Sequence, residues 1–199
     1  MVDSSIPTRA KVSEIKAEHF ESLGRTVVAF QRLEQAIVWG LLRLMEPKFA
    51  PKKFINLQVL INELSFKTKL NVLENIIATN RDYWLDAKNS RYHQDEFNQL
   101  LDELRSAINS AGPLEQRRNQ LFHSYWSGQS LMNTAQDGTI FRQKIRVRRD
   151  KTDVQFEHLS AGTLREVPDA MDKVSTVIEK NSWIIQQYLV DFEDEVQQS

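Results

Sequence analysis

Cysteine is absent from this sequence, which excludes disulfides, a thiol nucleophile and a thiolate metal site and fits a reducing compartment. Long hydrophobic runs are absent too, so no segment is predicted to cross a membrane. The first residues also lack the basic start and the apolar stretch of a signal peptide. We therefore predict a cytoplasmic protein with no membrane partner.

An excess of charge of either sign is also missing. The 26 Lys and Arg residues nearly balance the 27 Asp and Glu residues, so nucleic acid would have to be bound by a local basic patch. What is present is the composition of a folded protein, with 41% hydrophobic and 27% charged residues. A chain of 199 residues suits one domain. That domain is predicted over residues 1–199, with a flexible segment at 1–15.

The first regular segment is a long amphipathic helix predicted over residues 20–44. Its apolar residues recur in alternating steps of three and four, as on one face of a helix. They are Phe20, Leu23, Val27, Phe30, Ile37, Leu41 and Leu44. Glu34 occupies a position of this stripe where an apolar residue is expected. Pro47 and Pro51 end the helix, because proline lacks the amide hydrogen.

Two further helical runs follow in the middle of the chain. Residues 57–78 repeat the helical pattern, and a polar connection at 80–93 leads to an amphipathic helix at 97–111. Gly112-Pro113 either breaks or kinks this helix, and residues 113–126 continue as helix. The candidates for the buried face of the first of these runs are Leu60, Leu64, Leu70, Leu73 and Ile77.

Between residues 139 and 158 the pattern changes to strict alternation, which predicts a β-hairpin. One of its faces is basic, which is typical of a phosphate-binding strip. A turn at Asp150-Lys151 allows another interpretation, because it places Lys144 opposite Glu157 and leaves a mostly self-neutralised surface. The side chains that remain as candidate RNA contacts are Arg142, Arg146 and Arg149.

Together these segments predict an all-α protein, an antiparallel bundle of four to five helices. The small β-hairpin is an insertion before the last long helix, which is predicted from Thr163 onward. The chain shows no internal repeat and no low-complexity tract that would favour another architecture.

The stretch RRNQLFHSYW carries the most unusual pattern. On a helical wheel Arg118 falls near the middle of an apolar arc, Asn119 and His123 stack on one edge, and Arg117 lies toward the other edge. A charge in a buried stripe is costly unless it is paired, so we predict that Arg118 meets Glu34 across the bundle. One interpretation is a structural ion pair beside an edge histidine, with no chemistry.

The order Arg118-Asn119-x-x-x-His123, followed by Ser124, resembles the R-x4-6-H signature of the HEPN superfamily, in which a polar residue often follows the arginine. The segments FQRLEQAIVWGLL and LSFKTKLNVL also resemble this family, and the order of helices is similar over most of the chain. Arg117 satisfies the looser spacing as well. The resemblance implies a helical bundle that forms a homodimer with two motifs facing a shared cleft. In active members it implies metal-independent cleavage of RNA.

The residue types suit that chemistry. His123 would transfer protons at the 2′-hydroxyl and at the leaving 5′-oxygen, since imidazole titrates near neutral pH. Arg118 would hold phosphate oxygens in its planar fork, with Glu34 positioning it and Asn119 orienting the imidazole or contacting RNA. If Arg118 is buried with Glu34, Arg117 becomes the better phosphate ligand.

No metal site and no cofactor is predicted, because His19, His93 and His158 lie in separate segments without ligand spacing. The resemblance implies a toxin or phage-defence endoribonuclease that leaves 2′,3′-cyclic phosphate and 5′-hydroxyl ends. Its partners would be RNA and, as antitoxin, a small nucleotidyltransferase. Two alternatives stay open: a catalytically inactive HEPN-like module that binds RNA, a nucleotide or a protein, and a helical scaffold with no role in nucleic-acid binding.

Overall fold

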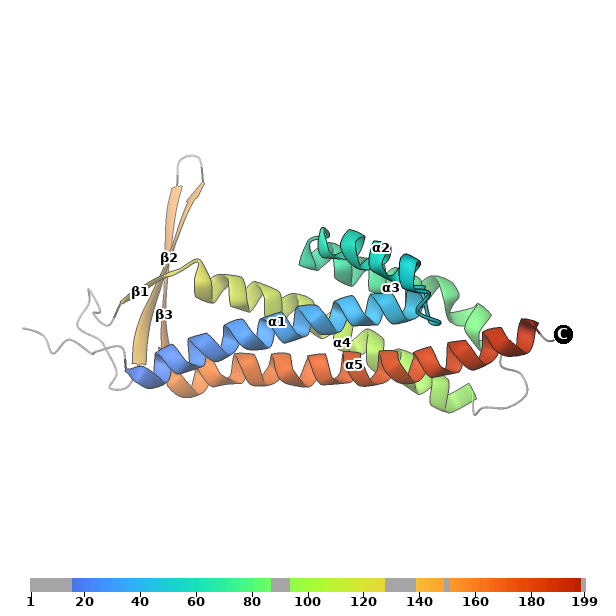
Figure 1. Ribbon diagram of the computed structural model, residues 1–199. Coiled ribbons are helices and arrows are strands. Elements are labelled where there is room, and N and C mark those ends of the chain that lie inside the picture. Colours follow the sequence, from blue (N-terminus) through green and yellow to red (C-terminus); the bar gives the residue numbers. More distant parts are fainter. Residues whose placement is uncertain (1–15, 87–93, 128–138, 149–150, 198–199) are drawn as a thin grey trace, which may run out of the picture.

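The computed structural model describes residues 16–86, 94–127, 139–148 and 151–197. Its helices are α1 (Ala17–Met45), α2 (Pro51–Asn62), α3 (Phe66–Asp86), α4 (Gln94–Phe122) and α5 (Ala161–Gln197). Its strands are β1 (Tyr125–Ser127), β2 (Thr139–Arg148) and β3 (Lys151–Ser160). The predicted all-α bundle with a β insertion before the last helix is confirmed (Figure 1). The segment 1–15, predicted to be flexible, lies outside the described residues.

The first and last helices form the long axis of the molecule and run in the same direction (Figure 1). Near their beginnings Arg25 Nη2 lies 2.8 Å from Asp169 Oδ1. Further along, Arg43 Nη1 donates a hydrogen bond to Ser182 Oγ over 3.1 Å. Helix α4 runs antiparallel to both, and α2 and α3 cover the second half of α1 (Figure 1). The bundle therefore contains one parallel helix pair among antiparallel neighbours.

The core lies between α1, α3, α4 and α5, where the amphipathic faces meet. The largest side chains that are fully buried in it are Leu33, Ile37, Leu41, Leu42, Leu73, Ile77, Phe97, Leu101, Leu104, Leu121 and Leu164. Helix α2 contributes Ile61 to this core, while Ile55 and Val59 on the same helix are exposed. None of the described helices is both long enough and apolar enough to pass through a bilayer.

The prediction of one helix over residues 57–78 is wrong, because the chain forms two helices there, α2 and α3. Ser65 separates them: its Oγ accepts a hydrogen bond from the backbone N–H of Thr68 over 3.2 Å, which is the geometry of a helix N-cap. Leu60, predicted to be buried, falls on α2 and is 65% exposed. The predicted core residues that follow Ser65, including Leu73, are buried.

Two helix boundaries also differ from the prediction. Pro51 is the first residue of α2, a position that proline tolerates because its missing N–H needs no partner there. Helix α3 continues to Asp86, so the predicted polar connection at 80–93 begins too early. Helix α4 passes through Pro113 without ending. Of the two outcomes predicted at Gly112-Pro113, a break and a kink, the break is therefore excluded.

The hairpin forms as predicted, but its register differs by two residues. Glu157 pairs with Arg142 instead of Lys144, and Arg148 pairs with Lys151. A shift of two leaves Arg142 and Glu157 on the same face of the hairpin, because side chains alternate with a period of two along a strand. The short strand β1 pairs with β2 and makes a three-stranded sheet in the order β1-β2-β3. The prediction of helix over residues 113–126 is therefore wrong at its end, since α4 ends at Phe122 and residues 125 and 126 belong to β1.

One core position lowers stability. His19, near the start of α1, is 1% exposed, and neither of its ring nitrogens has a hydrogen-bond partner among the residues that the structure describes. Because a buried polar atom without a partner costs about 1–3 kcal/mol, His19→Leu is expected to raise the free energy of unfolding by about 1 kcal/mol. Urea unfolding followed by circular dichroism measures this. An unchanged or lower midpoint would contradict it.

Candidate functional site

The candidate site lies at the C-terminal end of α4, where the chain leaves the bundle for the sheet (Figure 1). The half-buried guanidinium of Arg118 is stacked between two phenyl rings. Its Cζ lies 4.7 Å from the ring centre of Phe30 on α1 and 5.5 Å from that of Phe122, one turn further along α4. Its Nη1 donates a hydrogen bond to Asn119 Oδ1 over 2.9 Å. Arg118 thus lies on the core side of α4, as the helical wheel predicted.

The partner predicted for Arg118 is wrong. Glu34 Oε1 instead accepts a 2.7 Å hydrogen bond from Lys69 Nζ, and the Lys69 side chain is only 4% exposed. The reason is the orientation of α1. Glu34 lies one turn beyond Phe30, so the two side chains share a face of the helix. That face packs on α3, because the Phe66 ring lies 5.0 Å from the Phe30 ring. The sequence contained a signal for Lys69, since it falls three residues after Phe66 on the buried face of α3.

This arrangement leaves the charge of Arg118 without a counterion. In the part of the chain that the structure describes, no carboxylate forms an ion pair with Arg118, and its Nε is buried without a hydrogen-bond acceptor. The two phenyl faces stabilise the cation without neutralising it. An anion that reaches this end of α4 would therefore meet a positioned and unpaired guanidinium.

The other motif residues occupy the neighbouring row of α4. The backbone N–H of His123 donates to the carbonyl of Asn119 over 2.9 Å, so the helical turn extends to His123 and places the two side chains on one face. The His123 side chain is exposed, and no hydrogen bond or ion pair joins it to the described residues. Ser124 Oγ donates to the backbone carbonyl of Gln120, which gives Ser124 a structural role in ending the helix.

Arg117 is committed elsewhere. Its Nη2 donates to Glu157 Oε1 over 2.8 Å, and Arg142 Nη2 forms an ion pair with the other carboxylate oxygen. Arg142, a predicted RNA contact, is only 7% exposed and serves this contact between α4 and the hairpin. The other two predicted contacts, the side chain of Arg146 and all of Arg149, lie outside the described residues. Since Arg117 is paired and Arg118 is not, Arg118 is the better candidate for phosphate binding.

The two guanidinium groups change the titration of Glu157. Burial acts to raise the pKa of this carboxyl, but hydrogen bonds and charge from Arg117 and Arg142 outweigh burial and hold the pKa below the usual range of glutamate. Folding therefore favours the charged form. The resulting stability is complete above the unfolded-state pKa and is lost as the pH falls through the lower folded-state value.

A pH series tests this contact between α4 and the hairpin. The wild type is expected to be more stable than Glu157→Gln at neutral pH, and the difference should shrink as the pH falls below about 4.3, the ordinary pKa of glutamate. Urea unfolding of both proteins at several pH values measures it. Other carboxylates titrate equally in the two proteins and cancel from the difference. A difference that stays constant with pH would contradict the ion pair.

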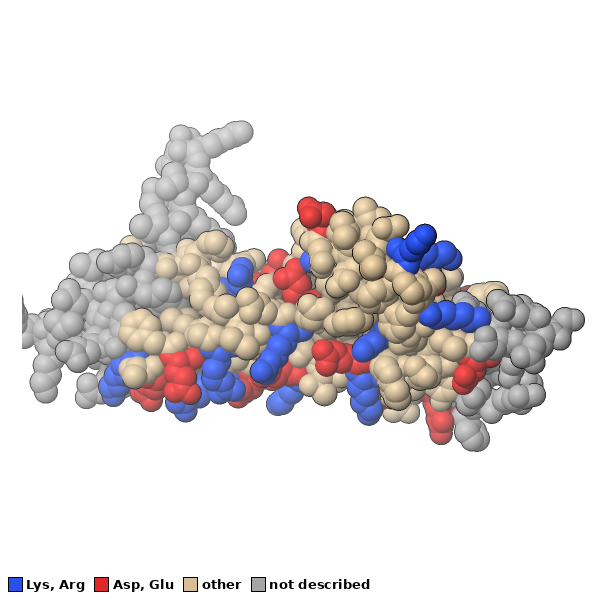
Figure 2. All heavy atoms as spheres, viewed as in Figure 1, with Lys and Arg blue, Asp and Glu red and all other residues tan. Residues whose placement is uncertain are grey.

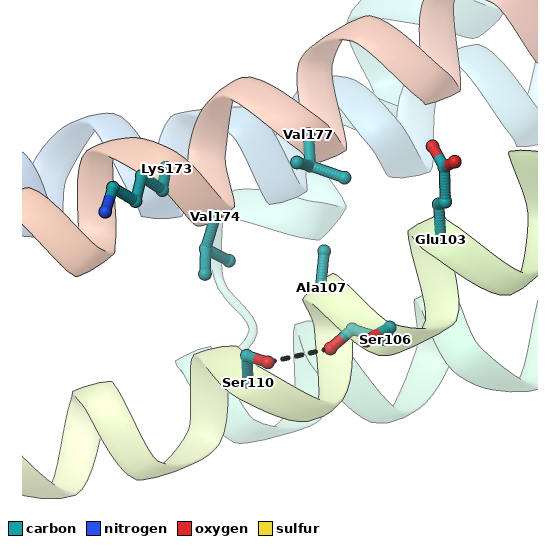
Figure 3. A pocket seen from close by; sticks show the side chains of 7 residues that line it. All are labelled: Glu103, Ser106, Ala107, Ser110, Lys173, Val174 and Val177. Carbon is teal, nitrogen blue, oxygen red and sulfur yellow. Dashed lines mark hydrogen bonds between the residues drawn. The ribbon is translucent and has the colours of Figure 1, made fainter.

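Two hollows lie away from the motif. One, of about 330 Å³, is between α4 and α5, where Val174 and Val177 project toward Ala107 (Figure 3). Two of the polar groups around it are already used: Ser110 Oγ donates to the carbonyl of Ser106, and Glu103 accepts from Asn181. A second hollow, of about 580 Å³, lies where α1 ends beside α5. Neither hollow is lined by a motif residue.

Two further features of the described residues are their charged surface and their possible metal-ligating side chains. Basic and acidic side chains are interspersed on the face that Figure 2 shows. Among the described residues, no group of three His, Cys, Asp or Glu side chains could hold a metal ion. Comparisons with protein-family models, with curated proteins and with solved structures gave no significant match to this chain.

Proposed function

We propose that the chain is a metal-independent endoribonuclease of the HEPN type that acts as a homodimer. The observation that carries this proposal is the unpaired guanidinium of Arg118, held between two phenyl rings one turn before an exposed His123. A fixed cation and an accessible imidazole are the two groups that cleavage of RNA by its own 2′-hydroxyl requires.

In the proposed reaction His123 removes the proton of a ribose 2′-hydroxyl, and the 2′-oxygen attacks the adjacent phosphorus. The bond from the 2′-oxygen to phosphorus forms, the bond from phosphorus to the 5′-oxygen breaks, and a proton is delivered to that 5′-oxygen. Arg118 stabilises the charge that develops on the phosphate oxygens. Asn119 fixes the guanidinium through its Oδ1. The products are a 2′,3′-cyclic phosphate and a 5′-hydroxyl, with no water consumed.

A second copy of the chain belongs to this proposal because the reaction needs both a base and an acid. One imidazole starts the reaction as base, and the His123 of a second copy would supply the acid. Phe122, next to His123, is an exposed phenyl ring that such a contact would cover. In the cell, the same proposal makes the chain a toxin or phage-defence effector whose activity a small nucleotidyltransferase restrains.

The test is incubation of the purified chain with a panel of labelled RNAs in EDTA, followed by analysis of the fragment ends. Cleavage is expected to continue in EDTA and to leave 2′,3′-cyclic phosphate ends. Its rate is expected to depend on protein concentration in the way that formation of a homodimer does. Arg118→Ala should lose cleavage because the phosphate charge is no longer stabilised. Arg165→Ala, which removes an exposed arginine from α5, is the matched control and should cleave normally.

The outcomes separate the proposal from its alternative. Cleavage that stops in EDTA, or that Arg118→Ala retains, would contradict the mechanism. If the wild type binds RNA without cleaving it, the chain is instead a binding module with the fold of a nuclease. The stacking of Arg118 on Phe30 would then serve recognition of a phosphate and no chemistry.

A further inference from the structure

The larger hollow, at the C-terminal end of α1, combines aromatic faces with positive charge. Trp183 on α5 is 53% exposed, an unusual state for a tryptophan, and it lines the hollow together with Trp39 and Phe49. Arg43 and Lys48 line it too. Aromatic rings beside cations are the groups that bind a base and its phosphate.

Arg43 is held in place by its surroundings. Its Nη1 donates to the carbonyl of Glu179 over 3.0 Å and to Ser182 Oγ over 3.1 Å, and its Cζ lies 5.8 Å from the ring centre of Trp39. Desolvation lowers the pKa of Arg43, against the raising effect of Glu179, but an arginine stays cationic at neutral pH. The structure describes no acceptor for its Nη2, so this donor is left for an anion in the hollow.

Gln186 adds a directional group. The residue is buried and lines the hollow, and its Nε2 donates to the carbonyl of Pro47 over 2.7 Å. This bond fixes which way the amide points. Among the described residues no donor reaches its Oε1, so this oxygen is the acceptor that Gln186 has left for a ligand. An exocyclic amino group of a base is such a donor.

The backbone conformation of Phe49 helps to form the same hollow. Phe49 has a φ of 50°, in the left-handed region that bulky residues rarely adopt. This conformation closes a turn in which the Phe49 N–H donates to the carbonyl of Glu46 over 3.1 Å. The Phe49 ring then meets the Phe54 ring edge-on at 4.9 Å. The turn thus holds an aromatic ring at the hollow at the cost of backbone strain.

We propose that this hollow binds a nucleotide whose base carries an exocyclic amino group, either free or within a single-stranded RNA. The base stacks on Trp183 and donates its amino hydrogen to Gln186, while Arg43 faces the phosphate. The volume of about 580 Å³ lies in the range of small-molecule sites. Arg43 lies about three and a half turns of α1 beyond Phe30, so this site is separate from the motif and does not rest on the nuclease proposal.

Isothermal titration with adenosine monophosphate tests the site on the full-length chain. Inosine monophosphate, which has a carbonyl in place of the amino group, is expected to bind about fivefold more weakly because the Gln186 hydrogen bond is lost. Adenosine and inorganic phosphate, tested separately, should each bind more weakly than the nucleotide. Inorganic phosphate that binds as tightly as the nucleotide would overturn the proposal, and so would equal binding of the two monophosphates.

A variant pair assigns the binding to the hollow. Trp183→Ala should weaken adenosine monophosphate binding about tenfold, because a stacked base is lost. Trp183 is exposed, so the variant should keep the wild-type fold, and circular dichroism checks this. Phe20→Ala removes another exposed aromatic ring, at the opposite end of α1, and should bind as the wild type does. Unchanged binding in Trp183→Ala, or no binding of the nucleotide to the wild type, would overturn the proposal.

Two further arms separate the ligand sources and the two sites. A hexa-adenylate that binds more tightly than adenosine monophosphate identifies an RNA strand as the ligand, and equal or weaker binding identifies the free nucleotide. Both results support the site. His123→Ala should bind the mononucleotide normally, so failure of the nuclease proposal leaves this measurement intact. Loss of mononucleotide binding in His123→Ala would overturn the separate site.

Discussion

His123→Ala is expected to lower the rate of RNA cleavage by about a hundredfold to ten-thousandfold, the contribution of a positioned acid or base. The melting temperature should not change. His123 is exposed, and its only described hydrogen bond is the one from its backbone N–H to Asn119, which alanine keeps. Single-turnover kinetics with a labelled RNA, at saturating protein, measures the rate without interference from binding.

Matched variants sharpen this result. His158→Ala removes an exposed histidine from β3 and should cleave at the wild-type rate. Arg118→Lys keeps the charge but loses the planar fork, so it should cleave at a rate between that of the wild type and that of Arg118→Ala. If His123→Ala cleaves as fast as the wild type, His123 is not the base, and the reaction proposed above is wrong.

The long helices were predictable from the helical period of their apolar residues, although Phe20, the first residue of the stripe predicted for α1, is 60% exposed. The stripe from Phe20 to Leu44 predicted α1 to within a few residues of its observed bounds, Ala17–Met45. The stripe at 57–78 failed for a reason that periodicity cannot detect. Its apolar spacing carries across Ser65, where a side-chain cap starts a new helix, and an apolar pattern contains no information on capping.

The candidate site was predictable in part. A helical wheel correctly placed Arg118 on the buried side of α4, because that depends only on the period of one helix. It could not identify the partner of Glu34, because a wheel does not say which of several helices a given face meets. The structure pairs Glu34 with Lys69 and stacks Arg118 on Phe30, and both contacts depend on how α1, α3 and α4 are arranged.

The hairpin shows the same limit on a smaller scale. Alternation fixed the two faces of β2 and β3, but the register depends on the turn. The observed register brings Arg142 opposite Glu157, and this carboxylate also accepts from Arg117. A basic side chain predicted as an RNA contact is therefore part of the joint that fixes the sheet to the end of α4.

Glu34→Ala should destabilise the chain by about 3 kcal/mol, because it leaves the ammonium of Lys69 buried without a partner. The Lys69 side chain is 4% exposed, whereas that of Glu34 is 37% exposed. The two halves of the pair are therefore not equivalent. Lys69→Met leaves a carboxylate that water can reach and should cost no more than about 1 kcal/mol.

Urea unfolding of both single variants and of Glu34→Ala/Lys69→Met measures this asymmetry as a double-mutant cycle. The double variant should recover most of the stability lost in Glu34→Ala, because it removes the buried charge and fills its place with apolar atoms. Equal losses in the two single variants would mean that the Lys69 ammonium is solvated.

Since Glu34 lies one turn from Phe30, which supports Arg118, a double variant that restores stability should restore cleavage as well. Glu34 would then act on the site through packing alone, with no part in binding phosphate.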